Sequence, residues 1–360
     1  MSQVQEVVQD QVIDDAAAAE HYARANAANA GQVRAAVVAA PSPAGSLWDY
    51  VSIARPDHWF KNVFMLLGVL LAAFYRPDLL AQLQWWKVLI AFAATCLVAS
   101  SNYVINELLD APTDRNHPTK RLRPIPSGRV KLAWAYAEWI LIGVLGLLVA
   151  ALINVPFLAT AALLLVMGMV YNIRPVRSKE LPYLDVLSES INNPIRLALG
   201  WFVVSPTAIP PMSLMIAYWM TGAFFMGTKR FAEYRSIGDG ARAAAYRSSF
   251  RYYDENRLLV SMFFYAMAAA LFLGVFIIRY HLELILSIPL VAGFFSYYLA
   301  IALKPESPVQ APEALYRERG LMVYLIICVT VFVGLMFVEI PALYQWFNVE
   351  PSSVPSLWRI

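Results

Sequence analysis

Long apolar runs separated by short polar segments make up most of this chain of 360 residues. A helix needs about 17–25 mostly apolar residues to cross a bilayer, or slightly fewer when polar residues at its ends reach the interface. The pattern therefore predicts about nine membrane-spanning helices, at residues 62–75, 85–105, 132–153, 156–171, 184–205, 210–228, 259–278, 282–302 and 321–347.

The composition agrees with this pattern. Hydrophobic residues make up 59% of the chain and charged residues only 15%, with a mean hydropathy of +0.54. A soluble domain carries roughly 25% charged residues, so a water-soluble globular enzyme is excluded. The predicted fold class is all-α, a polytopic integral membrane protein.

Three segments follow from the composition along the chain. We expect residues 1–45 to be a mobile Ala-rich N-terminal tail, 46–350 the membrane domain, and 351–360 a short C-terminal tail. The two cysteines, Cys96 and Cys328, each lie inside an apolar run, which indicates buried thiols and excludes a disulfide framework.

The basic residues are distributed unevenly between the two sides of the membrane. With nine alternating spans, 23 of the 28 lysines and arginines lie in the N-terminal stretch or in the loops near 106–131, 172–183, 229–258 and 303–320. By the positive-inside rule, the N-terminus and these loops are predicted to be cytoplasmic.

The first concentration of polar side chains follows the second predicted span. Asn106, Asp110 and Asp114 are four residues apart, so in a helix they share one face. We expect Pro112 to end or kink this helix between the two aspartates. Oxygen ligands on one face suit Mg²⁺, which takes one or two carboxylates together with water and substrate phosphate oxygens.

A basic cluster comes directly after this motif and consists of Lys120, Arg121 and Arg123. Carboxylates beside basic side chains are typical of a diphosphate site, because the acids hold the metal and the bases hold the phosphate oxygens. The alternative is an ordinary polar loop that carries the positive charge of its side of the membrane.

The second concentration lies within the fifth predicted span. Asp185, Glu189, Asn192 and Arg196 form one stripe of a helix. A carboxylate at the centre of a membrane helix costs roughly 2.5–3.5 kcal/mol, so we expect the stripe to face protein, water or metal. Pro194 is predicted to kink this helix. Alternatively, Glu189 and Arg196 form a neutralised pair that only holds helices together.

The four carboxylates of these two motifs would repel one another if they met without a counter-ion. Two Mg²⁺ ions would neutralise them and attract a polyphosphate, which is our hypothesis for the site. Lys61 and Asn62 open the first span, and Lys229 and Arg230 close the sixth, on the same side. Interfacial anchoring alone would also explain either of these stretches.

Over residues 48–347 the chain resembles the UbiA superfamily of intramembrane prenyltransferases. The first Asp-rich motif of that family, Asn-x-x-x-Asp-x-x-x-Asp, matches Asn106, Asp110 and Asp114. Its second, Asp-x-x-x-Asp, is met by Asp185 and Glu189. The resemblance implies nine transmembrane helices around a central cavity that faces the cytoplasm.

Within the superfamily, residues 55–62, 117–125 and 229–233 resemble one branch in particular. Its members transfer 5-phosphoribose from phosphoribosyl diphosphate to a polyprenyl phosphate, such as decaprenyl phosphate, and release diphosphate. Two features depart from the family: Glu107 follows Asn106 where Asp is usual, and residues 192–194 interrupt the second motif's helix. These departures leave the exact donor and acceptor open.

The resemblance also implies residue roles. The Mg²⁺ ligands would be Asn106, Asp110, Asp114, Asp185 and Glu189, and the catalytic residues Asp110, Asp114, Asp185 and Lys61. The substrate-binding residues would be Lys61, Asn62, Lys120, Arg121, Arg123, Tyr171, Arg196, Lys229 and Arg230. The partners would be the two substrates and the lipid bilayer, with no nucleic acid; both a monomer and a homo-oligomer stay open.

Two other functions compete with this interpretation. One is a standard prenyltransferase that moves a polyprenyl group from its diphosphate to an aromatic or other small acceptor, with Tyr171 shielding the carbocation. The surplus of basic residues suits a second phosphate group, which disfavours a standard prenyltransferase. The other is a transporter with an intramembrane ion path, but the acids gather at one membrane face and no polar path continues through the outer halves of the spans.

Overall fold

The protein is built from helices throughout the described part of the chain. The structure is a computed structural model that describes residues 45–350 except 116–119, 305–306 and 311. Its α-helices are α2 (Leu47–Ile53), α3 (Met65–Tyr75), α4 (Pro77–Leu80), α5 (Trp85–Asp114), α6 (Leu132–Ala151), α7 (Val155–Asn172), α8 (Leu184–Ser190), α9 (Asn192–Val204), α10 (Met212–Ile237), α11 (Gly240–Tyr246), α12 (Glu255–Tyr280), α13 (Ile288–Ala302), α14 (Arg319–Leu335) and α15 (Pro341–Trp346).

Short 3₁₀ segments complete the described elements: η1 (Pro56–Phe64), η2 (Lys120–Leu122), η3 (Ser178–Glu180), η4 (Ser248–Arg251), η5 (Leu282–Ser287), η6 (Pro308–Gln310) and η7 (Pro312–Arg317). The tails expected at 1–45 and 351–360 lie outside the described residues, apart from Gly45, and so do residues 117–119 of the family-like stretch.

The prediction of an all-α, polytopic integral membrane protein is confirmed. Six described helical segments are long and apolar enough to cross a membrane: Leu47–Tyr75, Trp85–Asp114, Leu132–Ala151, Val155–Asn172, Glu255–Tyr280 and Leu282–Ala302. The other three predicted spans coincide with α8–α9, with α10, and with α14 followed by α15. The last of these is therefore two helices rather than one, and the count of nine spans stays a prediction.

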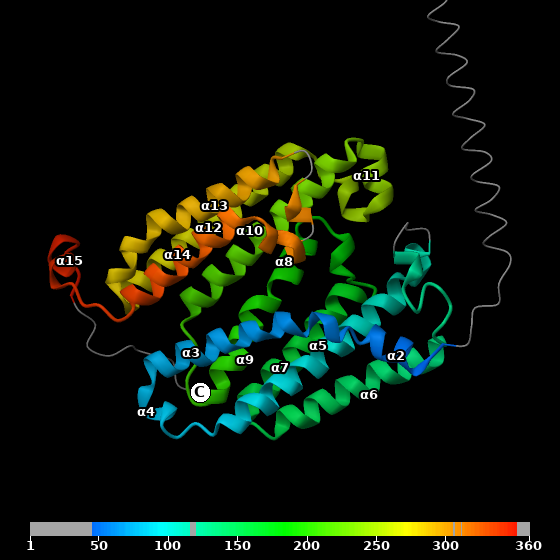
Figure 1. Cartoon of the computed structure of the whole chain (residues 1–360), viewed down its shortest axis with the longest axis horizontal. Coiled ribbons are helices and arrows are strands. Elements are labelled where there is room, and N and C mark those ends of the chain that lie inside the picture. The colour runs from blue at the N-terminus through cyan, green and yellow to red at the C-terminus, as the bar shows by residue number, and fades with distance from the viewer. Residues whose placement is uncertain (1–44, 116–119, 305–306, 311, 351–360) are drawn as a thin grey trace, which may run out of the picture.

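The helices form two packed groups that are joined by the broken helix α8–α9 (Figure 1). One hydrophobic core is made by α3, α5, α7 and α9, and a second is centred on α10, α12 and α13. Helix α9 packs mainly against α3 and α7 and also contacts α5 and α10, while α8 packs mainly against α10. The second predicted motif therefore lies on the element that links the two groups.

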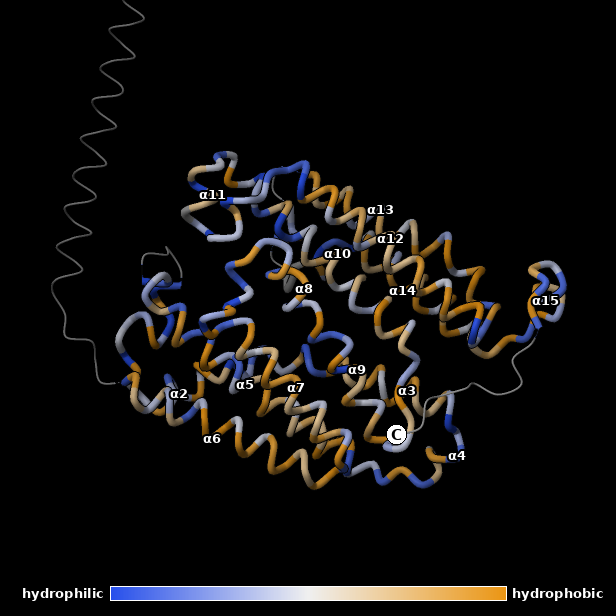
Figure 2. Tube along the Cα trace, turned by 180° about the vertical axis from the view of Figure 1, so that it is seen from behind, coloured by the Kyte–Doolittle hydropathy of each residue, from blue (hydrophilic) through white to orange (hydrophobic). Residues whose placement is uncertain are grey.

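The two ends of the bundle differ in character. Helix α11 and the loop after α5 lie together at one end, which we call the motif end, while α4 and α15 lie at the other (Figure 1). Hydrophilic residues gather around α11 and the loops beside it, and the long helices between the ends are mainly hydrophobic (Figure 2). This distribution is what a bilayer around the middle of the bundle requires.

The two prolines have different effects on their helices. Pro194 lacks the N–H that would bond the Ser190 carbonyl, and the helix is divided at Ile191 as predicted. Pro112 was expected to end or kink its helix between Asp110 and Asp114; it does not end the helix, because α5 continues through it to Asp114. One lost hydrogen bond is tolerated in a last turn that still closes, with Arg115 N donating to Ala111 O at 3.1 Å.

Helices α3 and α9 touch backbone to backbone because each has a glycine at the crossing. A Cβ at Gly200 would lie 1.7 Å from Met65 O, and a Cβ at Gly68 would lie 1.8 Å from Leu197 O. Neither contact leaves room for a side chain, so the sequence of both helices is constrained at this crossing.

We predict that Gly200→Ala forces α3 and α9 apart and lowers the stability of the protein by about 1–3 kcal/mol, as overpacking of a close contact does. Thermal unfolding in detergent measures this. Gly334→Ala is the matched control, because a Cβ there meets no atom within 4 Å. Equal unfolding temperatures for the two variants would contradict the tight crossing.

Candidate functional site

The first motif forms a binding surface for a cation at the motif end. Asn106 and Asp110 lie one turn apart on α5, and both approach the Lys179 ammonium, at 3.1 and 2.5 Å. Asn172, the last residue of α7, adds a third oxygen at 2.8 Å. Burial lowers the pKa of Lys179 below the usual lysine range, against the opposing effect of Asp110.

Arg177 supports the same carboxylate from the loop between α7 and α8. Its guanidinium donates to Asp110 Oδ1 at 3.1 Å and pairs with Glu180. Its backbone lies in the left-handed region, with a φ of 37°, which is uncommon for a residue with a side chain and is found where the surroundings hold it in place. The loop therefore presents two cations, Arg177 and Lys179, to one aspartate.

The last aspartate of the motif faces a different basic group. Asp114 is 5% exposed and accepts a hydrogen bond from Arg123 at 2.9 Å, with Lys120 at 3.9 Å. Lys120 also lies over the ring of Tyr246 on α11, at 6.0 Å from its centroid. Burial lowers the pKa of Lys120, while Asp114 raises it. The loop after α5 therefore contacts α11 at Lys120.

Glu107, a departure from the family pattern, turns away from Asn106 and Asp110. It is 3% exposed, and one of its carboxylate oxygens accepts a hydrogen bond from Ile125 N at 3.1 Å. This hydrogen bond holds the basic loop in place. The Glu that replaces the usual Asp here therefore alters a residue that supports the loop, and not one that binds the cation.

The acid that begins the second motif is the most enclosed side chain of the site. Asp185 is fully buried and accepts hydrogen bonds from Tyr253 at 2.8 Å, Ser249 at 3.1 Å, Arg247 at 3.3 Å and Arg230 at 3.4 Å. The pKa of Tyr253 is raised by burial and by the adjacent carboxylate, which keeps its hydroxyl a donor. Asp185 therefore ties α8 to α10, η4 and the start of α12.

The other acid of this motif connects it to the first. Glu189 accepts hydrogen bonds from Arg230 at 3.2 Å and from Tyr171 at 3.0 Å. The Tyr171 ring in turn lies 5.9 Å from the Lys179 ammonium, measured to its centroid. Both motifs therefore belong to one polar network that crosses between the two groups of helices.

The pairing of Glu189 with Arg196, considered from the sequence, does not occur. Glu189 pairs with Arg230 on α10 instead, and Arg196 donates through Nε to Asn62 Oδ1 at 3.0 Å. Asn62 is fully buried and donates in turn to Cys96 Sγ at 3.3 Å. This geometry favours a supporting role for Asn62 over direct contact with a substrate.

The remaining predicted side chains lie around this network. Lys61 lies over the Phe60 ring, at 5.9 Å from its centroid, on η1. Lys229 pairs with Glu233 at 4.0 Å, and Arg121 is exposed on the loop after α5. The contacts of these three side chains do not assign them a role in the network, so their catalytic or substrate-binding roles stay predictions.

The oxygen donors of both motifs suit a hard cation such as Mg²⁺, although no metal centre is assembled. In each motif the oxygens converge on a positively charged side chain, Lys179 in the first and Arg230 in the second. Carboxylate and amide oxygens are the donors that Mg²⁺ takes. The described residues contain no group of three His, Cys, Asp or Glu side chains that could hold a metal.

The sequence pattern missed several members of the network. Arg177, Lys179 and Arg247 were counted only as part of the positive charge of their loops, which gave no reason to single them out. Ser249 and Tyr253 carry no charge and lie at no regular spacing from the motifs. Only their contacts with Asp110 or Asp185 identify them.

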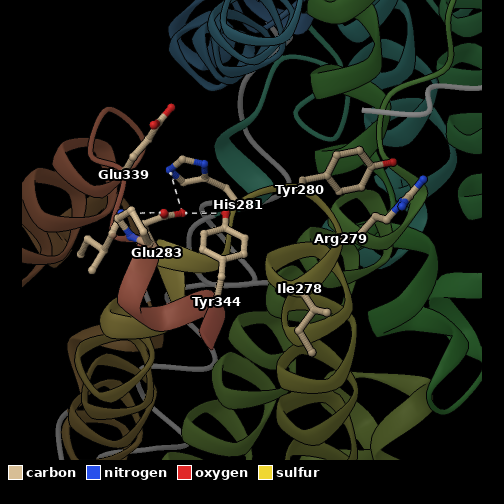
Figure 3. A pocket seen from close by; sticks show the side chains of 9 residues that line it. Ile278, Arg279, Tyr280, His281, Glu283, Glu339 and Tyr344 are labelled. Carbon is tan, nitrogen blue, oxygen red and sulfur yellow. Dashed lines mark hydrogen bonds and ion pairs between the residues drawn. The ribbon is translucent and has the colours of Figure 1, made fainter. Parts of the chain in front are cut away.

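A cavity of about 280 Å³ lies at the opposite end, away from the motifs (Figure 3). Its centre is the buried carboxylate of Glu283, which accepts hydrogen bonds from Ile340 N at 3.0 Å and Tyr344 at 3.2 Å and lies 3.6 Å from His281. These contacts fasten α15 and the segment before it to η5. We therefore assign the cavity a structural role.

Comparison with known proteins identifies the protein family. The model of the UbiA prenyltransferase family matches residues 62–317, so the chain belongs to the UbiA prenyltransferase family. The resemblance noted from the two Asp-rich motifs is thereby confirmed.

Individual relatives within this family show which enzymes the chain is similar to. The chain is 32% identical to decaprenyl-phosphate phosphoribosyltransferase from Mycolicibacterium smegmatis over 192 residues, which are 51% of this chain and 56% of that protein. The same enzyme from Corynebacterium glutamicum is also 32% identical, over 51% of this chain and 54% of its own length. The matched part thus spans about half the length of these relatives.

Solved structures share the fold. A UbiA homologue from Archaeoglobus fulgidus bound to DMAPP and Mg²⁺ aligns with a TM-score of 0.60 and 18% identity, over 81% of this chain and all of that one. A structure of digeranylgeranylglyceryl phosphate synthase aligns with a TM-score of 0.57 and 17% identity, over 81% of this chain and 99% of that one. Identities this low show the fold alone.

We predict that Asp185→Asn destabilises the protein by about 3 kcal/mol, because it removes the fully buried carboxylate that Arg230 and the half-buried Arg247 share, although Arg230 keeps Glu189 and Glu233. Tyr253→Phe removes one hydrogen bond and should cost only about 1 kcal/mol. Unfolding in detergent ranks the two variants. The reverse order would mean that the buried carboxylate does not hold α8 in place.

Proposed function

We propose that this protein is a Mg²⁺-dependent membrane transferase that moves 5-phosphoribose from phosphoribosyl diphosphate to a polyprenyl phosphate of the decaprenyl type. The observation that carries the proposal is the polar network at the motif end, in which the acids of the two motifs contact many lysine and arginine side chains. The relatives named as decaprenyl-phosphate phosphoribosyltransferases support this choice of substrates.

The surplus of cations distinguishes this reaction from prenyl transfer to an uncharged acceptor. Lys179, Arg177 and Arg230 each contact a motif carboxylate, while Lys120 and Arg123 flank Asp114. Phosphoribosyl diphosphate and a polyprenyl phosphate together bring three phosphate-bearing groups to one site. Guanidinium and ammonium groups are the natural partners for these groups.

In the proposed reaction an oxygen of the lipid phosphate forms a bond to the anomeric carbon of the ribose. The bond from that carbon to the diphosphate oxygen breaks, and diphosphate leaves with the electron pair. The nucleophile is already an anion, so no strong general base is required. The principal task of the site is to stabilise the negative charge that develops on the leaving diphosphate.

Different residues of the chain would contribute to stabilising the leaving diphosphate. Asn106, Asp110, Asp114, Asp185 and Glu189 are the proposed Mg²⁺ ligands; bound there, the metal would act as a Lewis acid towards the diphosphate. Lys179 and Arg177 would exchange the Asp110 carboxylate for diphosphate oxygens. Tyr171, held by Glu189, would cover the ribose ring from the α7 side.

The positive-inside rule supports placing the motif end at the cytoplasmic face. A water-soluble donor would then reach the network from the cytoplasm, and the isoprenoid tail would lie along the apolar helices.

A two-arm assay with purified protein in detergent and Mg²⁺ tests the function. One arm contains labelled phosphoribosyl diphosphate with polyprenyl phosphate, and the other polyprenyl diphosphate with labelled 4-hydroxybenzoate. We expect label to enter the organic phase in the first arm only, and EDTA to abolish it until Mg²⁺ is restored. Label in the second arm alone would make the protein an aromatic prenyltransferase.

Asp110→Asn should lower the transfer rate by about 100-fold or more, because it removes a charged ligand of the metal that would stabilise the leaving diphosphate. The matched control is Asp78→Asn, which removes a similar carboxylate from an exposed ion pair with Arg76 at the opposite end. Initial rates at saturating substrates measure the effect. Equal rates for the two variants would remove Asp110 from the mechanism.

A further inference from the structure

Arg196 is a cation inside the membrane domain that has no carboxylate partner in the described part of the chain. It lies in the first half of α9, and among the described residues no acid approaches within ion-pair distance of it. Its recorded contact is the hydrogen bond from Nε to Asn62 Oδ1. A charged side chain in a membrane helix is costly unless a partner or ligand compensates it.

The structure holds this guanidinium in a fixed place. Asn62 is fully buried and anchored to Cys96 on α5. Three residues after Asn62, Met65 on α3 meets Gly200 on α9, one turn after Arg196. The close crossing of α3 and α9 therefore sets the distance between Asn62 and Arg196 and leaves the two terminal nitrogens of the guanidinium for a ligand. A planar fork of this kind suits two oxygens of one phosphate.

The depth of Arg196 indicates which phosphate it would take. It follows Glu189 by seven residues along α8–α9, which corresponds to about 10 Å further from the motif end. In a displacement at the anomeric carbon, the attacking oxygen approaches from the side opposite the leaving group, with reacting atoms about 3 Å apart. If the diphosphate leaves from the acids at the motif end, the attacking phosphate lies deeper.

The surrounding residues agree with this assignment. Lys120, Arg121 and Arg123, at the motif end, are partly or fully exposed to water, which suits a soluble donor. Arg196 is itself partly exposed, but Ile195, Ala198 and Leu199 beside it on α9 belong to the apolar α3–α9 core, along which an isoprenoid tail can lie next to its own phosphate.

We propose that Arg196, positioned by Asn62, binds the phosphate of the acceptor lipid on the side of the ribose opposite the leaving diphosphate. This inference rests on the proposed phosphoribosyl transfer, and it makes Arg196 the residue that distinguishes a polyprenyl phosphate from an uncharged acceptor.

A binding experiment without donor tests this separately from the reaction. The purified protein is titrated with a short polyprenyl phosphate and with the matching polyprenol in detergent. Wild type should prefer the phosphate at least tenfold, and Arg196→Gln should bind the two lipids with nearly equal affinity. Arg196→Lys should restore part of the preference. An unchanged preference in Arg196→Gln would overturn the proposal.

Kinetics distinguish the lipid phosphate from the phosphate of the donor. Arg196→Gln should raise KM for polyprenyl phosphate at least tenfold and leave KM for phosphoribosyl diphosphate within twofold. Asn62→Ala should shift the same KM by a smaller factor. A rise in KM for phosphoribosyl diphosphate alone would place the donor's 5-phosphate at Arg196 and overturn the proposal.

Arg76→Gln, which removes a partly exposed arginine at the opposite end, is the control for both experiments and should leave both affinities unchanged. Unfolding temperatures close to that of wild type confirm that the variants are folded. Absence of phosphoribosyl transfer by wild type would refute the proposed function itself, a result that the donor-free binding experiment does not depend on.

Discussion

The cost of placing charge inside a membrane protein governs the rest of this structure. Each acid of the two Asp-rich motifs is compensated by a basic side chain: Asp110 by Lys179, Asp114 by Arg123, and Asp185 and Glu189 by Arg230. Where the pair is buried, as for Asp185 and Arg230, removing one partner is far more costly than the pair itself is stabilising. The helices that carry these residues are therefore held at defined positions. The network stabilises the fold and is also the candidate site.

The same compensation explains how one site can suit both a metal and a diphosphate. Oxygen donors that converge on an ammonium or guanidinium also suit a divalent cation, and the displaced basic groups are then free to bind phosphate oxygens. An arrangement of this kind keeps the acids from repelling one another before substrates bind. Arg196 is the exception, because no acid that the structure describes compensates it and its supports are an amide and a tight helix crossing.

The broken helix α8–α9 links packing to chemistry. Its first part carries Asp185 and Glu189 against α10, and its second part packs against α3 and brings Arg196 to Asn62 on η1. Pro194 separates the two parts, which lets one segment of chain belong to both groups of helices. The polar network at the motif end and the deeper guanidinium are thus set at a fixed spacing by a single element.

The sequence by itself determined that this is a helical membrane protein with two acid motifs. Long apolar runs and acids spaced four residues apart are local properties of a chain. It also singled out Arg196, through the stripe that it shares with Asp185. Only the tertiary structure decided the partners. The counter-ions Lys179, Arg247 and Arg230 come from distant segments, and the sequence offered Arg196 as the partner of Glu189 where the fold supplies Arg230. Which charges compensate one another depends on which helices cross, and spacing along one helix carries no information about that.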